Sequence, residues 1–163
     1  MTYSRQKMCF KLAALAVTLL AMTPYAGTAA AATGDCWSRT EMVSSQVREL
    51  QTKMMVAALQ CRTVQGSSIL ANYNTFVRRF RTDITKHNDV LKKRFLRLYG
   101  ARGERAFDSY TTQLANSYGA EAAQADFCTR MEQNTQEVVS ISDSELASVA
   151  QHAIAVPEGV CVN

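Results

Sequence analysis

One histidine has the neighbours that a general base needs. His87 follows Asp83 by four residues, which is about one helical turn, and it precedes Asp89 by two. A carboxylate that orients an imidazole ring allows the ring to take a proton from a substrate or a water molecule. This pattern keeps a small secreted hydrolase or mutase as the alternative function. A histidine packed between helices and hydrogen-bonded to a neighbouring helix would explain the same position.

Other catalytic motifs are missing from the sequence. It contains no G-x-S-x-G, H-E-x-x-H, Walker or G-x-G-x-x-G pattern. The second histidine, His152, stands near the end of a short predicted helix, where a cation or a capping donor suits the helix dipole. We therefore expect no catalytic site, no metal ion and no cofactor.

Basic residues of the segment 69–99 supply the candidate partner-binding surface. On one continuous helix, four side chains opposite the apolar stripe would form a line about 27 Å long. These residues are Arg79, Lys86, Lys93 and Arg97. Such a line could bind an acidic protein, an anionic surface or an anionic polymer.

The distribution of charge also allows a purely structural role for these residues. The segment 78–105 carries ten basic and three acidic side chains, whereas 106–163 carries one basic and eight acidic. Adjacent antiparallel helices that hold these two blocks could neutralise each other. The same basic residues would then pair within the protein instead of contacting a partner.

Residues 1–32 have the three-part pattern of a secretory signal. Arg5 and Lys7 form a basic start, and an uncharged apolar run and a tract of small residues follow. The apolar run is too short to span a bilayer comfortably. We therefore predict cleavage after Ala32 and export to a bacterial periplasm or to the medium. The mature chain 33–163 is expected to be a single disulfide-bonded helical domain without a transmembrane segment.

Removal of the signal changes the charge balance. The whole chain has 18 basic and 14 acidic side chains and a net charge of +4. Because 1–32 contains three basic residues and no acidic ones, the mature chain keeps 15 basic and 14 acidic side chains, a net charge of +1. A net charge this small gives the mature chain no general electrostatic attraction to nucleic acid or to a membrane. The expected partner is another protein of the cell envelope or the secreted pool, and no nucleic acid.

Four cysteines remain in the mature chain, at positions 36, 61, 128 and 161. An even number in an oxidising compartment predicts two disulfides, and the wide spacings do not match a zinc site. Positions counted along the predicted helices favour the pairs Cys61 with Cys128 and Cys36 with Cys161. The two other connectivities remain open from the sequence.

Helical patterns cover most of the mature chain. Ser38 with Glu41 forms a capping box, and apolar residues at steps of three and four predict a helix over 39–65. A second apolar stripe, free of Pro and Gly, predicts one long helix over 69–99. A turn at Gly100 follows it.

The remaining segments predict two more helical parts. After Gly103 the apolar pattern continues on a third helix and changes its arc at Gly119, which predicts a kink or a break there. Ser142 with Glu145 forms a second capping box, which opens a short helix that ends near Ala153.

The expected fold is all-α, an up-down-up bundle of long antiparallel helices with a shorter C-terminal helix, stapled by two disulfides. Strand alternation and hairpin turns are lacking. The predicted signal, the missing catalytic motifs and the line of basic residues together lead us to expect a non-enzymatic exported binding module that recognises another envelope or secreted protein. Inhibitor, immunity, secretion-accessory and envelope-chaperone roles are all compatible with this fold.

Overall fold

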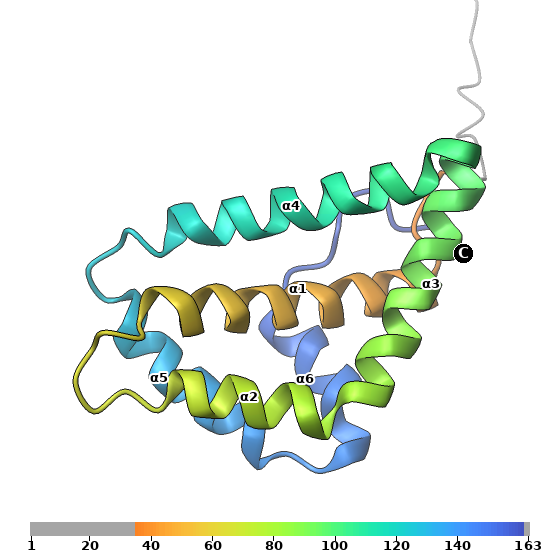
Figure 1. Ribbon diagram of the computed structural model, residues 1–163. Coiled ribbons are helices and arrows are strands. Elements are labelled where there is room, and N and C mark those ends of the chain that lie inside the picture. Colours follow the sequence, from red (N-terminus) through yellow and green to blue (C-terminus); the bar gives the residue numbers. More distant parts are fainter. Residues whose placement is uncertain (1–34, 162–163) are drawn as a thin grey trace, which may run out of the picture. The chain divides into compact units, whose positions relative to one another are not determined.

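The computed structural model describes residues 35–161, and the predicted signal at 1–32 lies outside them. The all-α class and both predicted disulfides are confirmed. Within the described residues, no helix is both long enough and apolar enough to cross a bilayer. The α-helices of this part of the chain (Figure 1) are α1 (Arg39–Gln60), α2 (Ile69–Arg79), α3 (Arg81–Tyr99), α4 (Gly103–Glu121), α5 (Phe127–Ser140) and α6 (Leu146–Ala153).

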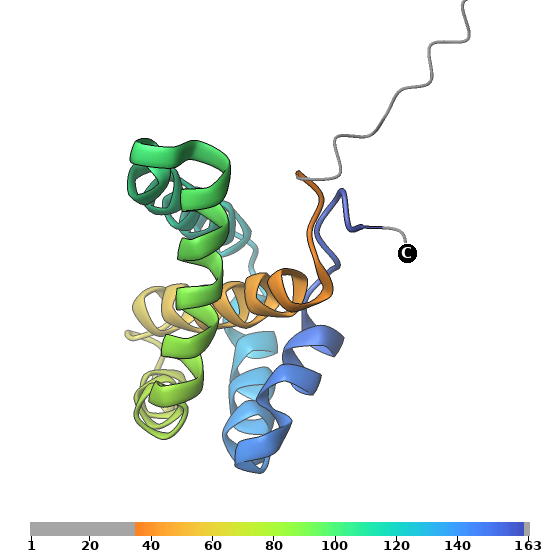
Figure 2. The ribbon, with the colours of Figure 1, turned by 90° about the vertical axis from the view of Figure 1, so that its right-hand side faces the viewer.

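Helix α1 is the centre of the bundle, because each of the other α-helices packs against it. Helix α2 returns antiparallel to α1, and α4 runs again in the direction of α1 (Figure 1). Figure 2 shows α4 on one side of α1 and the pair α5 and α6 on the other. The up, down, up order of α1, α2 and α4 agrees with the prediction, but α3 is inserted between α2 and α4 and crosses α1.

The prediction of one continuous helix over 69–99 is wrong, because the chain leaves helical geometry at Phe80 (φ −94°, ψ 14°). Phe80 is 1% exposed and packs against Phe76, with ring centroids 5.4 Å apart. A straight helix over 69–99 would measure about 45 Å, against about 33 Å for α1. The division allows both halves to pack on α1, so tertiary burial outweighs a helical pattern that contains no Pro or Gly.

Helix α1 also ends earlier than predicted. Its last residue is Gln60 rather than residue 65, because the chain turns at Cys61, which forms the disulfide with Cys128. Gly66 adopts a φ of 78° in the turn that follows. Val64, the last apolar residue of the predicted helix 39–65, is 47% exposed.

The predicted kink at Gly119 is also absent from the described structure, since α4 continues through this residue to Glu121. Tyr118 holds this end of α4 against α1. Its side chain is buried, and its hydroxyl donates to the Glu49 carboxylate at 2.7 Å. The turn to α5 therefore begins after Glu121, two residues later than the apolar pattern indicates.

Both predicted capping boxes are present. The Ser38 hydroxyl accepts from the backbone N–H of Glu41, and the Glu41 carboxylate accepts from the backbone N–H of Ser38 at 3.0 Å. Ser142 and Glu145 make the same exchange. The second box opens a 3₁₀ turn, Asp143–Glu145, that leads into α6.

Gly100 and Gly103 turn the chain from α3 into α4, as predicted. Gly100 has a φ of 54°, which L-residues rarely adopt. A Cβ atom on Gly103 would lie 2.6 Å from the Cα of Leu96. The close approach of the two helices at this corner therefore requires glycine.

The buried apolar side chains form three clusters. The main cluster joins α1 to α2, α3, α5 and α6 and includes Val47, Leu50, Met54, Phe76, Phe80, Ile84, Val138, Leu146, Ala150 and Ile154. A second surrounds the disulfide Cys61–Cys128. The third joins α3 to α4 through Leu91, Phe95 and Phe107.

Candidate functional site

The division at Phe80 places the predicted basic residues on two helices. Arg79 is the last residue of α2, whereas Lys86, Lys93 and Arg97 lie on one face of α3. All four residues are exposed. They do not form a single line along one helix axis, and they differ in what they contact.

Arg79 contacts the turn between α5 and α6. Its Nε lies 2.6 Å from the Asp143 carboxylate, and its Nη1 donates to the carbonyl of Val139 at 3.1 Å. The guanidinium also lies over the Phe80 ring, 5.0 Å from the ring centroid. Asp143 belongs to the acidic block of the sequence, so this ion pair joins the two charge blocks within the protein. Arg79 therefore has a structural contact.

Arg97 shares its partner with Arg94, a residue that the sequence analysis does not select. Arg97 Nη2 lies 2.7 Å from Glu41 Oε1, and Arg94 Nη1 lies 3.1 Å from Glu41 Oε2. Arg94 is 5% exposed and also donates to the carbonyls of Asp35 and Cys36, at 2.6 and 2.8 Å. The two arginines therefore fix α3 to the start of α1 and to the segment before it.

The segment before α1 is held by several kinds of contact. The Arg94 guanidinium lies 3.9 Å from the centroid of the Trp37 ring. The backbone N–H of Trp37 donates to the Gly159 carbonyl at 2.8 Å, and the backbone N–H of Cys161 donates to the Trp37 carbonyl at 2.9 Å. We call this region the N-terminal clasp, defined as Glu41, Arg94, Trp37 and the disulfide Cys36–Cys161.

Glu41 is ionised more readily in this setting than an ordinary glutamate. Burial alone would raise the pKa of its carboxyl group. Hydrogen bonds from Ser38 and Arg97 and the charge of Arg94 outweigh burial and hold the pKa of Glu41 below its ordinary value. The clasp thus depends on a negative charge at Glu41.

The ammonium groups of Lys86 and Lys93 lie at the surface of α3. They are seven residues apart, so they share a face of α3 and lie about 10 Å apart along its axis. Lys86 contacts Asp83 of its own helix at 3.3 Å, with 70% of its side chain exposed. Exposed pairs of this kind contribute little to stability. Among the described residues, neither lysine has an ion pair with another helix, and we call the two the lysine pair.

His87 packs between α3 and α1. Its Nδ1 lies 3.0 Å from Ser44 Oγ, whose own hydroxyl donates to the Thr40 carbonyl at 2.8 Å. Nδ1 therefore carries the proton and donates to Ser44. Burial lowers the pKa of His87, and the charge of Asp83 opposes that shift. The structure brings His87 together with the buried Ser44, and within residues 35–161 neither Asp83 nor Asp89 hydrogen-bonds to the imidazole.

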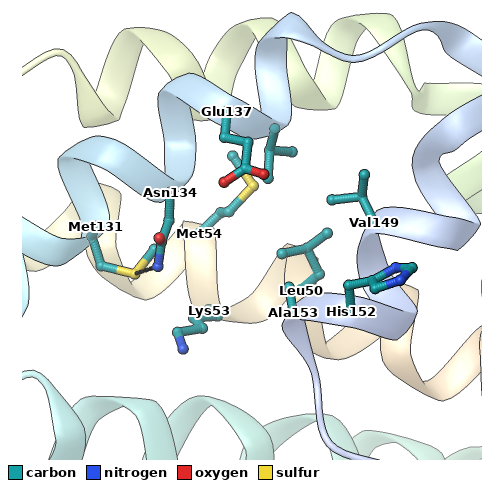
Figure 3. Close-up of a pocket in the computed structure, with 10 residues that line it drawn as sticks. Leu50, Lys53, Met54, Met131, Asn134, Glu137, Val149, His152 and Ala153 are labelled. Carbon is teal, nitrogen blue, oxygen red and sulfur yellow. Dashed lines mark hydrogen bonds between the residues drawn. The ribbon is translucent and has the colours of Figure 1, made fainter.

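A pocket of about 470 Å³ opens between α1, α5 and α6 (Figure 3). This volume lies within the range of small-molecule sites. Most of its floor belongs to the main core cluster or packs against it. The apolar floor consists of Leu50, Met54, Met131, Val138 and Val149.

Polar side chains form the rim of the pocket, namely Lys53, Asn134, Glu137 and His152. In Figure 3 the Glu137 carboxylate points into the pocket, near Met54, whereas the Lys53 ammonium points away on the opposite side. Lys53 Nζ lies 3.8 Å from the Glu121 carboxylate and 5.4 Å from the centroid of the Tyr118 ring, both on α4. The charge of Lys53 is therefore directed to α4.

The other two polar rim residues make hydrogen bonds within their own helices. The Asn134 amide donates to Met131 Sδ at 3.9 Å, so its Oδ1 stays available as an acceptor. His152 Nδ1 lies 2.7 Å from the Ser148 carbonyl. Because a carbonyl can only accept, Nδ1 carries the proton and donates to Ser148. Asn134 Oδ1 and the Glu137 carboxylate therefore provide acceptors beside an apolar floor.

Sequence reasoning missed Arg94 and the pocket for different reasons. Arg94 follows His87 by seven residues, and this spacing places it on the side of α3 that faces α1. This spacing in the sequence could have identified Arg94 as a residue directed towards α1. For the pocket, its lining residues Val138 and Val149 lie in or against the main core cluster, on inward faces of α5 and α6. Whether three inward faces meet tightly or leave an opening depends on helix packing, which periodicity does not specify.

Comparison of the chain with protein-family models, with curated proteins and with solved structures finds no match. The functional interpretation therefore rests on the geometry of the chain itself. Two surfaces carry it. One is the lysine pair on α3, and the other is the pocket between α1, α5 and α6.

Proposed function

We propose that the protein is a non-enzymatic, exported binding module that recognises another envelope or secreted protein through the lysine pair. One observation carries the proposal: Lys86 and Lys93 present two cations on one face of a helix, while that helix is fixed from its other side. A fixed pair of exposed cations attracts an acidic protein surface and orients it during encounter.

The attachment of α3 explains why the two cations keep their positions. Leu91 and Phe95 are 0% and 7% exposed, in the cluster between α3 and α4. Arg94 joins the same helix to Glu41 of α1. A partner would therefore meet a surface that is already ordered, which lowers the entropy cost of binding.

The two disulfides support a place in an oxidising compartment. Disulfides persist in periplasmic and secreted proteins and are rare in a reducing cytosol. If the predicted signal is cleaved, intact-mass analysis of exported protein should find a chain that begins at Thr33. Alkylation without reductant should find no free thiol. Retention of 1–32, or an alkylated cysteine in the exported chain, would contradict the proposed export.

Affinity capture from an envelope extract of the source organism tests the binding role. Three mature proteins are compared: the wild type, K86Q/K93Q, and R102Q/R105Q as a matched control. The control removes the same charge from two exposed arginines at the corner between α3 and α4. We expect K86Q/K93Q to capture less of the partner and to depend less on salt, since exposed charges act over a screening length of about 10 Å at 0.1 M salt.

The control decides what a loss of capture means. R102Q/R105Q should retain capture if Lys86 and Lys93 form the recognition surface. Equal losses in both variants would show a general charge effect, and unchanged capture by K86Q/K93Q at low salt would rule the lysine pair out. Anionic vesicles form a separate arm, and binding to vesicles without capture of a protein would replace the protein partner with an anionic surface.

A further inference from the structure

We propose that the pocket between α1, α5 and α6 binds a small amphiphile with an ammonium head and an aliphatic tail. The Glu137 carboxylate binds the ammonium group, and the apolar floor encloses the tail. This site lies on helices other than α3 and does not rest on the proposed function. It is a second binding site, for a ligand of opposite charge to the partner of the lysine pair.

The floor of the pocket suits an aliphatic chain. Leu50, Met54 and Met131 are each at most 4% exposed, although they line the pocket. Unbranched methionine side chains adapt to the shape of a flexible ligand. The volume of about 470 Å³ accommodates a tail of several carbon atoms. Each methylene group that becomes buried should raise the affinity about fourfold.

The rim selects the charge of the head group. Glu137 is exposed, and among the described residues no cation pairs with its carboxylate. Lys53, the basic residue on the rim, contacts Glu121 and the Tyr118 ring on α4 instead. An anionic head group would therefore meet an unneutralised carboxylate, whereas a cationic one is attracted to it.

The hydrogen-bond groups agree with the charge. A primary ammonium group has three N–H donors and no acceptor. The pocket rim offers the Glu137 carboxylate and Asn134 Oδ1 as acceptors. A head group with N–H donors therefore suits the rim better than one that only accepts hydrogen bonds.

Three eight-carbon probes separate the head groups: octylammonium and octanoate, each below its critical micelle concentration, and 1-octanol below its solubility limit. Binding to the mature protein is followed by NMR of methionine methyl groups labelled with ¹³C. Met54 and Met131 report on the pocket, and Met42, which lies outside its lining, serves as the internal control. We expect octylammonium to shift the Met54 and Met131 signals at the lowest concentration, octanol at a higher one and octanoate last.

Three variants test which residue acts on which part of the ligand. E137Q should weaken octylammonium binding about fivefold to tenfold and leave octanol within about twofold, because it removes only the charge. E104Q removes the same charge from an exposed position at the start of α4 and should change neither probe. A153F adds bulk at an exposed position of the lining and should weaken octylammonium and octanol alike.

Each of the opposite results overturns the proposal. Octanoate that binds as tightly as octylammonium would exclude selection by Glu137. Equal effects of E137Q and E104Q would show a general charge effect. Absence of shifts at Met54 and Met131 with any probe would show that the pocket takes no amphiphile. Circular dichroism melting curves confirm that each variant keeps the fold of the wild type before binding is compared.

Discussion

The two disulfides close opposite ends of α1 in different surroundings. Cys36 precedes the first residue of α1, and its disulfide with Cys161 lies within the N-terminal clasp. Cys61 follows the last residue of α1 and is 0% exposed, and its disulfide with Cys128 is packed among apolar side chains. We call the second region the apolar staple, defined by the disulfide and its neighbours Ala57, Ala58, Ile69, Phe127 and Met131.

The two disulfides have different contacts because the backbone around one is helical and the backbone around the other is not. At the apolar staple, the end of α1 meets the first turn of α5, and both segments satisfy most of their backbone hydrogen bonds within helices. At the clasp, residues 35–38 and the tail after α6 lie outside the α-helices, so their carbonyl and N–H groups need partners from elsewhere. Arg94 and the pairing of Trp37 with Val160 supply these partners.

A carboxylate accompanies each disulfide in spite of this difference. Glu41 accepts from the start of α1 in the clasp. Near the apolar staple, Glu132 of α5 accepts from the Ser68 N–H at 3.1 Å and from the Ser67 hydroxyl at 3.0 Å, just before α2 begins. The Ser68 hydroxyl contributes most to lowering the pKa of Glu132. Helix starts at both ends therefore use an ionised side chain, but arginines balance the charge only in the clasp.

The largest expected effect comes from opening each disulfide in turn. The bonds close loops of 125 and 67 residues, for which chain entropy alone predicts losses of about 4 to 5 kcal/mol that differ by only about 0.5 kcal/mol. C61A/C128A should lose more stability than C36A/C161A, because it also removes the fully buried sulfur of Cys61 from an apolar cluster. Free energies of unfolding in urea measure the difference. Equal losses, or a larger loss for C36A/C161A, would contradict the distinction between the two ends.

The next effect concerns the buried arginine of the clasp. Arg94→Met leaves the carbonyls of Asp35 and Cys36 without their donor, and it takes one of two cations from Glu41. Loss of one partner of a buried ion pair costs about 3 to 5 kcal/mol. Arg97→Met is the matched control and should cost about 1 kcal/mol or less, because Arg97 is 48% exposed. Similar losses for the two variants would show that burial of Arg94 is not what stabilises the clasp.

A smaller effect follows from the ionisation of Glu41. Its pKa is lowered in the folded protein, so its charge stabilises the fold above the unfolded pKa of about 4.3, and this contribution is lost as the pH falls through the lower folded value. E41Q has no carboxyl group at this position. Its stability should therefore fall less than that of the wild type between about pH 5 and pH 3, as measured by urea midpoints. The same slope in both proteins would contradict the role of Glu41, and E158Q, an exposed glutamate outside the clasp, should keep the wild-type slope.

The smallest effect on the free energy of unfolding is expected for residues away from both ends of α1. K86Q/K93Q should change the free energy of unfolding by less than about 0.5 kcal/mol per residue, because both lysines are exposed. R79Q/R97Q removes the same charge but breaks the contacts to Asp143 and Glu41, so its melting temperature should fall further. If K86Q/K93Q is the less stable variant, the lysine pair has a structural role that the ion pairs do not show.

Features that depend on short stretches of sequence were predictable. The two capping boxes need only four consecutive residues each, and both are present. The glycines of the corner between α3 and α4 were also identified from the sequence. The disulfide pairs were chosen correctly from positions counted along the predicted helices, and Cys128 lies on a separate helix, α5.

Features that depend on packing between helices were not predictable from periodicity. Nothing near Phe80 breaks a helix locally, and its position in the core decides the division. The spacing of Arg94 from His87 indicates which side of α3 it occupies, but not that a carboxylate and two carbonyls lie opposite and allow it to be buried. The pocket rim unites Lys53, Asn134, Glu137 and His152 from three helices, a combination that no sequence spacing indicates.

The clasp also determines how the folded protein responds to a pulling force. Cys36 and Cys161 have Cα atoms 5.0 Å apart and are covalently joined. Tension applied to the chain before Cys36 and after Cys161 therefore passes through the sulfur–sulfur bond and does not load the helices between them. After reduction of this bond, the same tension would act first on the pairing of Trp37 with Val160 and on the contacts of Arg94. While this disulfide is intact, the pulling force does not act on the helical fold. Reduction of the disulfide exposes the fold to that force.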